Sequence, residues 1–116
     1  MTDRAIFRVR DIKQSIVSIR AMLDGRTFDE MYENPVTRAA FERFLEILSE
    51  ASRSVPEAWK AEFGPEIPWR SVADLGNTLR HAYHRADTRL LWSVYENDLE
   101  PLEAVIDAML AAHDGP

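Results

Sequence analysis

The strongest constraint on the fold is an apolar stripe near the start of the chain. Its side chains recur at steps of three and four residues, the spacing that puts them on one face of an α-helix. They are Val9, Ile12, Ile16, Ile19 and Leu23. No segment alternates apolar and polar residues for long enough to predict a β-strand. We therefore expect an all-α protein, a small antiparallel bundle of about five helices with short connections.

Turn and capping residues predict where the other helices begin and end. Asn34-Pro35 is typical of a helix start, because asparagine caps the free N–H groups and proline suits the first helical position. This helix should end before Pro56, and residues 57–63 can form a short helix. Later helices are expected at about 68–84, 87–97 and 101–112, with Asp87 capping the second of these, while Gly25 should stop the first helix and residues 26–33 form a polar connection.

Composition bounds the class of protein. The 116 residues suit a single domain, 1–116, and 46% hydrophobic and 29% charged residues are ordinary for a globular chain. There is no cysteine, which excludes disulfides and thiolate sites and fits a protein of the reducing cytoplasm. No segment is apolar over the length of a membrane span, so no membrane partner is expected. The net charge of −6 disfavours a protein that coats nucleic acid but leaves room for a small basic site.

One predicted helix carries the residues that suggest chemistry. On it, Asn77, Arg80, His81 and His84 share a polar face opposite an apolar face, and Tyr83 lies at the border. The residues alone leave two readings open, either a surface or interface without chemistry or a functional site. A metal site at the two histidines is disfavoured, because a helical His-x-x-His pattern is weak by itself. We therefore expect neither a metal nor another cofactor.

Four segments occur in an order and spacing that resemble one known family. They are Asn77…Arg80-His81-Ala82-Tyr83, residues 45–51 ending in Glu50-Ala51, Pro65-Glu66-Ile67-Pro68-Trp69, and the last section from Asp87 to Leu102. Together they resemble the HepT-like toxin subunits of bacterial HEPN–nucleotidyltransferase toxin–antitoxin modules, and the resemblance covers nearly the whole chain. Members of this family are helical bundles that form homodimers.

The resemblance implies a function and a partner. Known members are metal-independent ribonucleases, and a small nucleotidyltransferase antitoxin neutralises them by transferring AMP onto the motif tyrosine. By position, His81 matches the catalytic histidine, Tyr83 the modified tyrosine, and Asn77 the polar residue after the family's arginine. The resemblance thus implies a toxin that cleaves RNA as a homodimer and pairs with a nucleotidyltransferase.

The motif departs from the family at the arginine. The positions that would hold it carry Asp74, Leu75 and Gly76. Arg80 directly precedes His81 and, on a continuous helix, would point to the same side. Gly76 inside a helix is unfavourable and suggests the close approach of another backbone or a ligand. The departure also supports an alternative, a catalytically inactive module that pairs with a nucleotidyltransferase or binds a nucleotide.

If the site is active, each residue has an expected role. His81 would act as general acid and base, because its pKa lies near neutrality, and Arg80 would clamp the phosphate. Asn77 would orient these groups by hydrogen bonding. His84 and Arg85 are expected to help bind the RNA strand.

Overall fold

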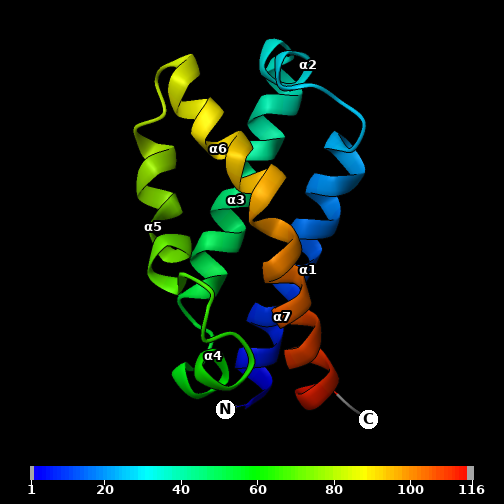
Figure 1. The fold of residues 1–116 in the computed structure, drawn as a ribbon, viewed down its shortest axis with the longest axis vertical. Helices are drawn as coiled ribbons and strands as arrows, with labels where there is room; N and C mark the ends of the chain where they lie inside the picture. The colour runs from blue at the N-terminus through cyan, green and yellow to red at the C-terminus, as the bar shows by residue number, and fades with distance from the viewer. Residues whose placement is uncertain (1, 115–116) are drawn as a thin grey trace.

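The computed structural model describes residues 2–114; residues 1, 115 and 116 lie outside the described part of the chain. Over the described residues the chain forms seven helices: α1 (Thr2–Leu23), α2 (Phe28–Glu33), α3 (Pro35–Ser52), α4 (Glu57–Phe63), α5 (Trp69–Arg80), α6 (Arg85–Asn97) and α7 (Leu99–His113). The long helices run side by side along the bundle, with α6 and α7 stacked end to end in one column (Figure 1). The all-α prediction is confirmed. The expected count of about five is low, because the short helices α2 and α4 add to five long ones.

α1 buries the apolar stripe that the sequence predicts. Each of the five stripe residues, from Val9 to Leu23, is 0% exposed. This complete burial has a simple cause, since α3 and α7 both pack against α1. The helix ends before Gly25, whose φ of +87° lies in the left-handed region that glycine adopts without steric strain. The predicted helix stop is therefore confirmed.

α2 is a helix that the sequence analysis missed, and the predicted polar connection over residues 26–33 is wrong. A capping box starts it: the Glu30 N–H donates to Thr27 Oγ1 at 3.1 Å, and the Thr27 N–H donates to Glu30 Oε1 at 2.8 Å. The pair satisfies two N–H groups that a short helix otherwise leaves open. Phe28 and Met31 are buried, so the helix is also held by packing.

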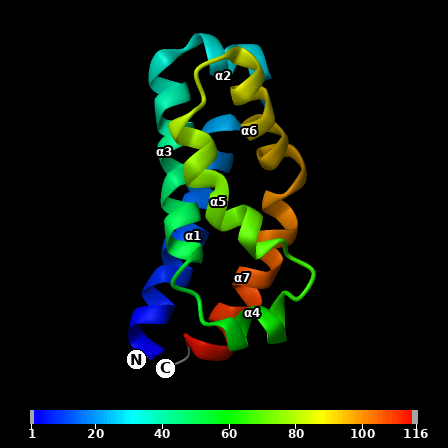
Figure 2. The same ribbon diagram turned by 90° about the vertical axis from the view of Figure 1, so that its left-hand side faces the viewer.

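α3 is the helix against which both α1 and α5 pack (Figure 2). Its predicted start is confirmed, because Asn34 Oδ1 accepts hydrogen bonds from the N–H groups of Val36 and Thr37, each at 3.1 Å. Its buried side chains include Phe41 and Leu45, neither of which is exposed. The buried side chains of α3 meet those of α1, α2, α6 and α7 in one apolar core.

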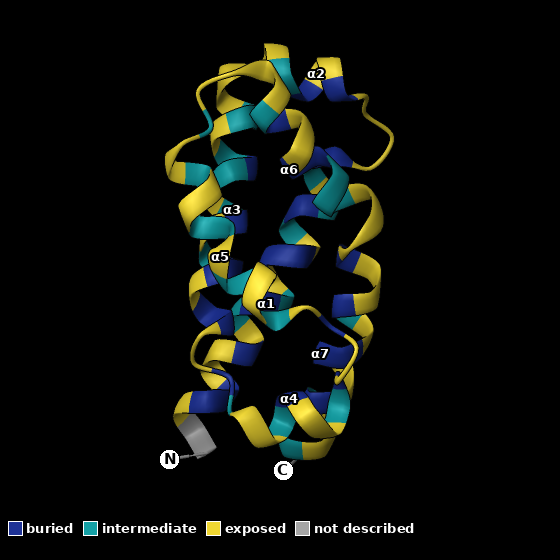
Figure 3. Cartoon of the chain, turned by 60° about the vertical axis from the view of Figure 1, so that its left-hand side comes forward, coloured by how far each residue is buried: buried dark blue, intermediate teal, exposed yellow. Residues whose placement is uncertain are grey.

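α5 differs from the other long helices in having no buried residue (Figure 3). Its apolar side chains, among them Val72, Leu75 and Leu79, are partly buried and pack against the edge of the core. Hydrogen bonds hold α5 to α3, because Ser49 Oγ and an Arg53 guanidinium nitrogen both donate to the Ala73 carbonyl, at 3.0 and 2.9 Å. α5 is thus hydrogen-bonded to α3, while its apolar side chains remain only partly buried.

The break between the last two helices follows the prediction. α6 ends at Asn97, and α7 begins at Leu99 after Asp98, where the sequence indicates a break. Pro101 lies in the first turn of α7, where it costs no backbone hydrogen bond. None of the helices in the described range combines the length and the apolar character needed to cross a bilayer.

Candidate active site

The helix that carries the motif ends earlier than predicted. α5 stops at Arg80, and residues 81–84 form the connection to α6. The His81 N–H donates to the Thr78 carbonyl at 3.1 Å and the Ala82 N–H to the Leu79 carbonyl at 3.3 Å. These bonds reach back three residues and close the last turn tightly. The prediction that His81 and the later motif residues continue one helical face is therefore wrong.

A new cap explains why the chain leaves the helix here. The His84 N–H donates to Asp87 Oδ2 at 3.0 Å, and α6 begins at Arg85. Asp87 was predicted to precede the helix as its cap, but it lies in the first turn and His84 takes the cap position. A carboxylate in the first turn is favoured by the partial positive charge there. The apolar spacing continues through this region, so only the capping contact reveals the break.

Asn77 and Arg80 are brought together at the end of α5. An Arg80 guanidinium nitrogen donates to Asn77 Oδ1 at 3.4 Å, and both side chains are exposed. The two residues are one turn apart, the spacing at which helical side chains meet. The amide oxygen steadies the guanidinium while leaving most of its N–H groups free for an anion.

His81 and Tyr83 form a second pair, in the connection itself. Their rings meet edge to face, with centroids 6.2 Å apart and an interplanar angle of 69°. Both residues are exposed, and Tyr83 is one of the most open apolar side chains of the protein at 76%. The imidazole and the phenol are therefore accessible to a large substrate or to a modifying enzyme.

Arg85 has a partner that the sequence analysis did not foresee. Its guanidinium forms an ion pair with Asp29 of α2 and lies over the rings of Phe28 and Tyr32, with Cζ 5.1 and 4.8 Å from the two centroids. The start of α6 is thereby fastened to α2. The Thr27-x-x-Glu30 capping pattern is the sequence signal that predicts a helix at α2, where the partner of Arg85 lies.

Of the positions that replace the family's arginine, Leu75 and Gly76 are partly buried. Asp74 is exposed. A Cβ atom added at Gly76 would lie 3.6 Å from Ser49 Oγ, an ordinary van der Waals distance. The helix contact that Gly76 suggests is present, since α5 packs against α3, but no backbone atom of α3 lies within 4 Å of that added Cβ. Instead the Gly76 N–H donates to Ser49 Oγ at 3.1 Å, which adds to the contacts between α5 and α3.

An apolar cleft of about 290 Å³ runs beside α5. Its lining includes Val72 and Leu75 of α5, Val94 of α6 and Leu99 of α7. Among the described residues, no salt bridge joins α5 to another helix. The motif helix is thus separated from the α6–α7 column by apolar surface that the chain itself does not cover.

The site offers an imidazole, a guanidinium, an amide and a phenol within one turn and the connection that follows it. These groups can move a proton and bind a phosphate. Among the side chains that the structure describes, no group of three or more histidine, cysteine, aspartate or glutamate residues is placed to hold a metal ion.

Comparison with known proteins identifies the family. The sequence model of the HepT-like ribonucleases matches residues 12–109 of the chain. This protein belongs to the HepT-like family. A relative from Thermococcus cleftensis, named "Probable ribonuclease HepT", is 33% identical over 101 residues, which cover 87% of this chain and 91% of the relative.

Two further HepT-like relatives carry RNase names. One, from Methanocaldococcus jannaschii, is 29% identical over 83% of this chain and 82% of its own length. The other, from Caldanaerobacter subterraneus, is 28% identical over 74% of this chain and 76% of its own length. No solved structure matches this HepT-like chain. The family resemblance inferred from the sequence motifs is therefore confirmed.

Proposed function

We propose that the protein acts as one domain and is a metal-independent endoribonuclease, the toxin of a module whose antitoxin is a nucleotidyltransferase. One observation carries this proposal. In a chain of the HepT-like ribonuclease family, Arg80, His81 and Tyr83 are all exposed at the same end of α5. The absence of cysteine fits action on RNA in the reducing cytoplasm.

The proposed reaction is an internal transesterification of RNA. The His81 imidazole removes the proton of a ribose 2′-hydroxyl, whose oxygen attacks the adjacent phosphorus. The bond from phosphorus to the 5′-oxygen breaks, and that oxygen takes up a proton from an imidazolium. The products are a 2′,3′-cyclic phosphate and a 5′-hydroxyl. The Arg80 guanidinium, steadied by Asn77, binds the non-bridging oxygens and stabilises their charge in the transition state.

A homodimer would complete this site. α5 has no buried residue, and its apolar face borders an uncovered cleft. A second copy packed against that face with two-fold symmetry would bury Leu75 and Leu79 and bring a second His81 and Arg80 toward the same groove. One imidazole could then act as base and the other as acid. Leu79→Glu should give monomers in sedimentation velocity and lose RNA cleavage, whereas Glu46→Gln on exposed α3 surface should do neither.

The ribonuclease activity is tested by incubating the purified protein with total cellular RNA in EDTA. We expect cleavage that leaves cyclic phosphate ends and that disappears in His81→Ala. Glu46→Gln is the control, since Glu46 is exposed on α3 and has no role in the proposed site. Equal cleavage by the protein and His81→Ala would remove His81 from the mechanism. No cleavage by either, with a folded dimer, would contradict the enzyme.

Tyr83 is proposed as the acceptor of AMP. Its phenol oxygen would attack the α-phosphorus of ATP, forming a phosphodiester to tyrosine and releasing pyrophosphate. The exposed ring meets the access requirement, and the added negative charge beside Arg80 would repel the RNA phosphate. Intact mass after incubation with a cognate nucleotidyltransferase and ATP should rise by one adenylyl group, and Tyr83→Phe should abolish the gain. A gain that survives in Tyr83→Phe would exclude this residue.

The second candidate is an inactive module that binds the nucleotidyltransferase. It is favoured by Gly76, which stands where the family's arginine is expected. Expression in a bacterial host separates the two functions. Growth arrest that is lost in His81→Ala supports the toxin, whereas unimpaired growth together with a stable complex with the nucleotidyltransferase supports the module.

A further inference from the structure

α2 presents an aromatic platform beside the connection that carries His81 and Tyr83. The rings of Phe28 and Tyr32 stack, with centroids 5.6 Å apart and an interplanar angle of 15°. Phe28 also meets the buried Trp92 edge to face, at 5.9 Å. The platform is therefore anchored in the core and is not a mobile surface feature.

Three guanidinium groups lie over this platform. The Cζ atom of Arg38 is 4.7 Å from the Tyr32 centroid, that of Arg85 is 4.8 Å from the same ring, and that of Arg89 is 4.4 Å from the Phe28 centroid. An arginine stacked on a ring keeps its charge, and the ring limits its movement. Its N–H groups point from the edge of the guanidinium plane, where a phosphate oxygen can accept them in pairs.

The surface between the arginines is hollowed and carries no carboxylate in its lining. A hollow of about 300 Å³ is lined by Phe28, Arg85, Ala86 and Arg89. Three acidic residues near this hollow each have a partner, and one of those partners is Arg85 of the hollow itself. Glu30 holds the α2 capping box, Asp87 accepts the His84 N–H, and Asp29 pairs with Arg85.

We propose that this hollow, which we call the α2–α6 hollow (Phe28, Arg85, Ala86 and Arg89), binds a phosphodiester group of the RNA strand next to the group that is cleaved. Arg85 follows His84 directly, so the hollow adjoins the motif along the chain. Asp29 acts as an internal substitute for the phosphate, occupying Arg85 until RNA displaces it. This inference rests on the proposed ribonuclease function.

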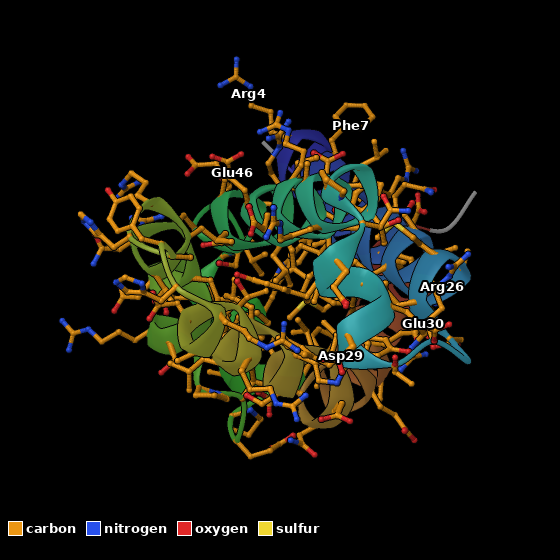
Figure 4. The ribbon with its side chains drawn as sticks, turned by 90° about the horizontal axis from the view of Figure 1, so that it is seen from above. Arg4, Phe7, Arg26, Asp29, Glu30 and Glu46 are labelled. Carbon is orange, nitrogen blue, oxygen red and sulfur yellow. The ribbon has the colours of Figure 1, made fainter. Side chains whose placement is uncertain are left out.

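A matched pair of control residues is available on α3. Arg43 and Glu46 form an exposed ion pair like that of Arg85 and Asp29, with side chains 66% and 54% exposed against 51% and 68%. Seen down the bundle, Asp29 and Glu46 lie on different sides of the molecule (Figure 4). Substitutions at the α3 pair therefore change the same net charge without altering the hollow.

The test measures binding of a fluorescent single-stranded oligouridylate by anisotropy over a range of salt concentrations, with His81→Ala present throughout to prevent cleavage. Arg89→Gln should weaken binding roughly tenfold, the size of one charge-assisted contact. It should also reduce the slope of log affinity against log salt by about 0.7. Asp29→Asn should tighten binding, because it releases the Arg85 guanidinium. Arg43→Gln and Glu46→Gln should produce neither change.

The outcomes separate this site from the function itself. One outcome is that each substitution in the hollow changes oligouridylate affinity no more than its control, Arg43→Gln or Glu46→Gln, while the protein still binds and cleaves RNA. The hollow is then not an RNA site, and the ribonuclease proposal stands. If the protein neither binds the oligouridylate nor cleaves total RNA, both proposals fail. Thermal unfolding of each variant checks that its fold is retained. Asp29→Asn keeps the test decisive if Arg89→Gln unfolds, because a gain in binding cannot come from unfolding.

Discussion

α1 and α5 have the same kind of apolar stripe and opposite degrees of burial. The stripe of α1 is fully buried because α3 and α7 cover it from two sides. α5 packs against α3 and leaves its remaining apolar surface at the cleft beside α6 and α7. The candidate catalytic residues lie at the end of the half-covered helix. One side of the bundle thus maintains the fold, and the other keeps surface available for a second molecule.

The largest expected effect contrasts a core leucine with a leucine of α5. Leu45→Ala should lower the free energy of unfolding by about 2–5 kcal/mol, because Leu45 is completely buried. Leu79→Ala should cost less, since its side chain is only partly buried within one chain. Urea denaturation at several protein concentrations measures both. If a second copy covers α5, the loss of unfolding free energy in Leu79→Ala should depend on protein concentration. Equal losses in the two variants at every protein concentration would contradict the contrast between α1 and α5.

The next effect concerns the helix caps on the two sides. Asn34→Ala should cost about 1 kcal/mol, because it removes the oxygen that accepts two N–H groups at the start of α3. Asn97→Ala is the control, since Asn97 is exposed at the end of α6. Urea midpoints of the two variants provide the comparison. Similar shifts in both would mean that the α3 cap has no special role.

A smaller effect is expected at the ion pairs that join α1 to α7. Glu103 pairs with Lys13, at 2.9 Å, and with Arg20. Glu103→Gln should cost about 0.2–1 kcal/mol at low salt and less at high salt, as expected for partly exposed pairs. Glu100→Gln, an exposed residue of the same helix, is the reference. A loss that does not change with salt would indicate packing and not charge.

The smallest effect, absent at neutral pH, involves Tyr95. Burial and its hydrogen bond to Asp24, at 2.6 Å, raise the pKa of the Tyr95 phenol to about 12. The unfolded chain loses this proton near pH 10, so the folded state binds more protons between about pH 10 and 12. Stability should therefore be unaffected below pH 10 and fall as the pH rises through this window. Absorbance titration should show one late-titrating tyrosine that Tyr95→Phe removes; its persistence would assign the shift elsewhere.

Most of the fold could be predicted from the sequence because its signals are local. The three-and-four spacing predicts α1, and Asn34-Pro35 predicts the start of α3. α2 was missed because six residues are too few for a periodic pattern, and only its capping box indicates it. The end of α5 was missed because the apolar spacing continues past Arg80, and the cap at His84 overrides it.

The candidate site could be predicted only in part, for a related reason. The motif residues are recognised by their type and order. This identifies the residues but does not predict whether their backbone is helical. The ion pair of Arg85 and Asp29 joins residues 56 positions apart, and no local pattern reports such a contact. The sequence therefore does not predict how short elements, such as α2 and the connection before α6, pack against each other.

The break in the chain at Arg80 has a mechanical consequence. Residues 81–84 join two helices, of which α5 is held to α3 through Ser49 and Arg53 and α6 to α2 through Arg85. His81 and Tyr83 lie in this connection and outside both helices, so a change in the spacing of their rings requires no break in a helical hydrogen bond. The helices thus fix the two ends of the connection, while the geometry of the imidazole and the phenol depends on the four residues between them.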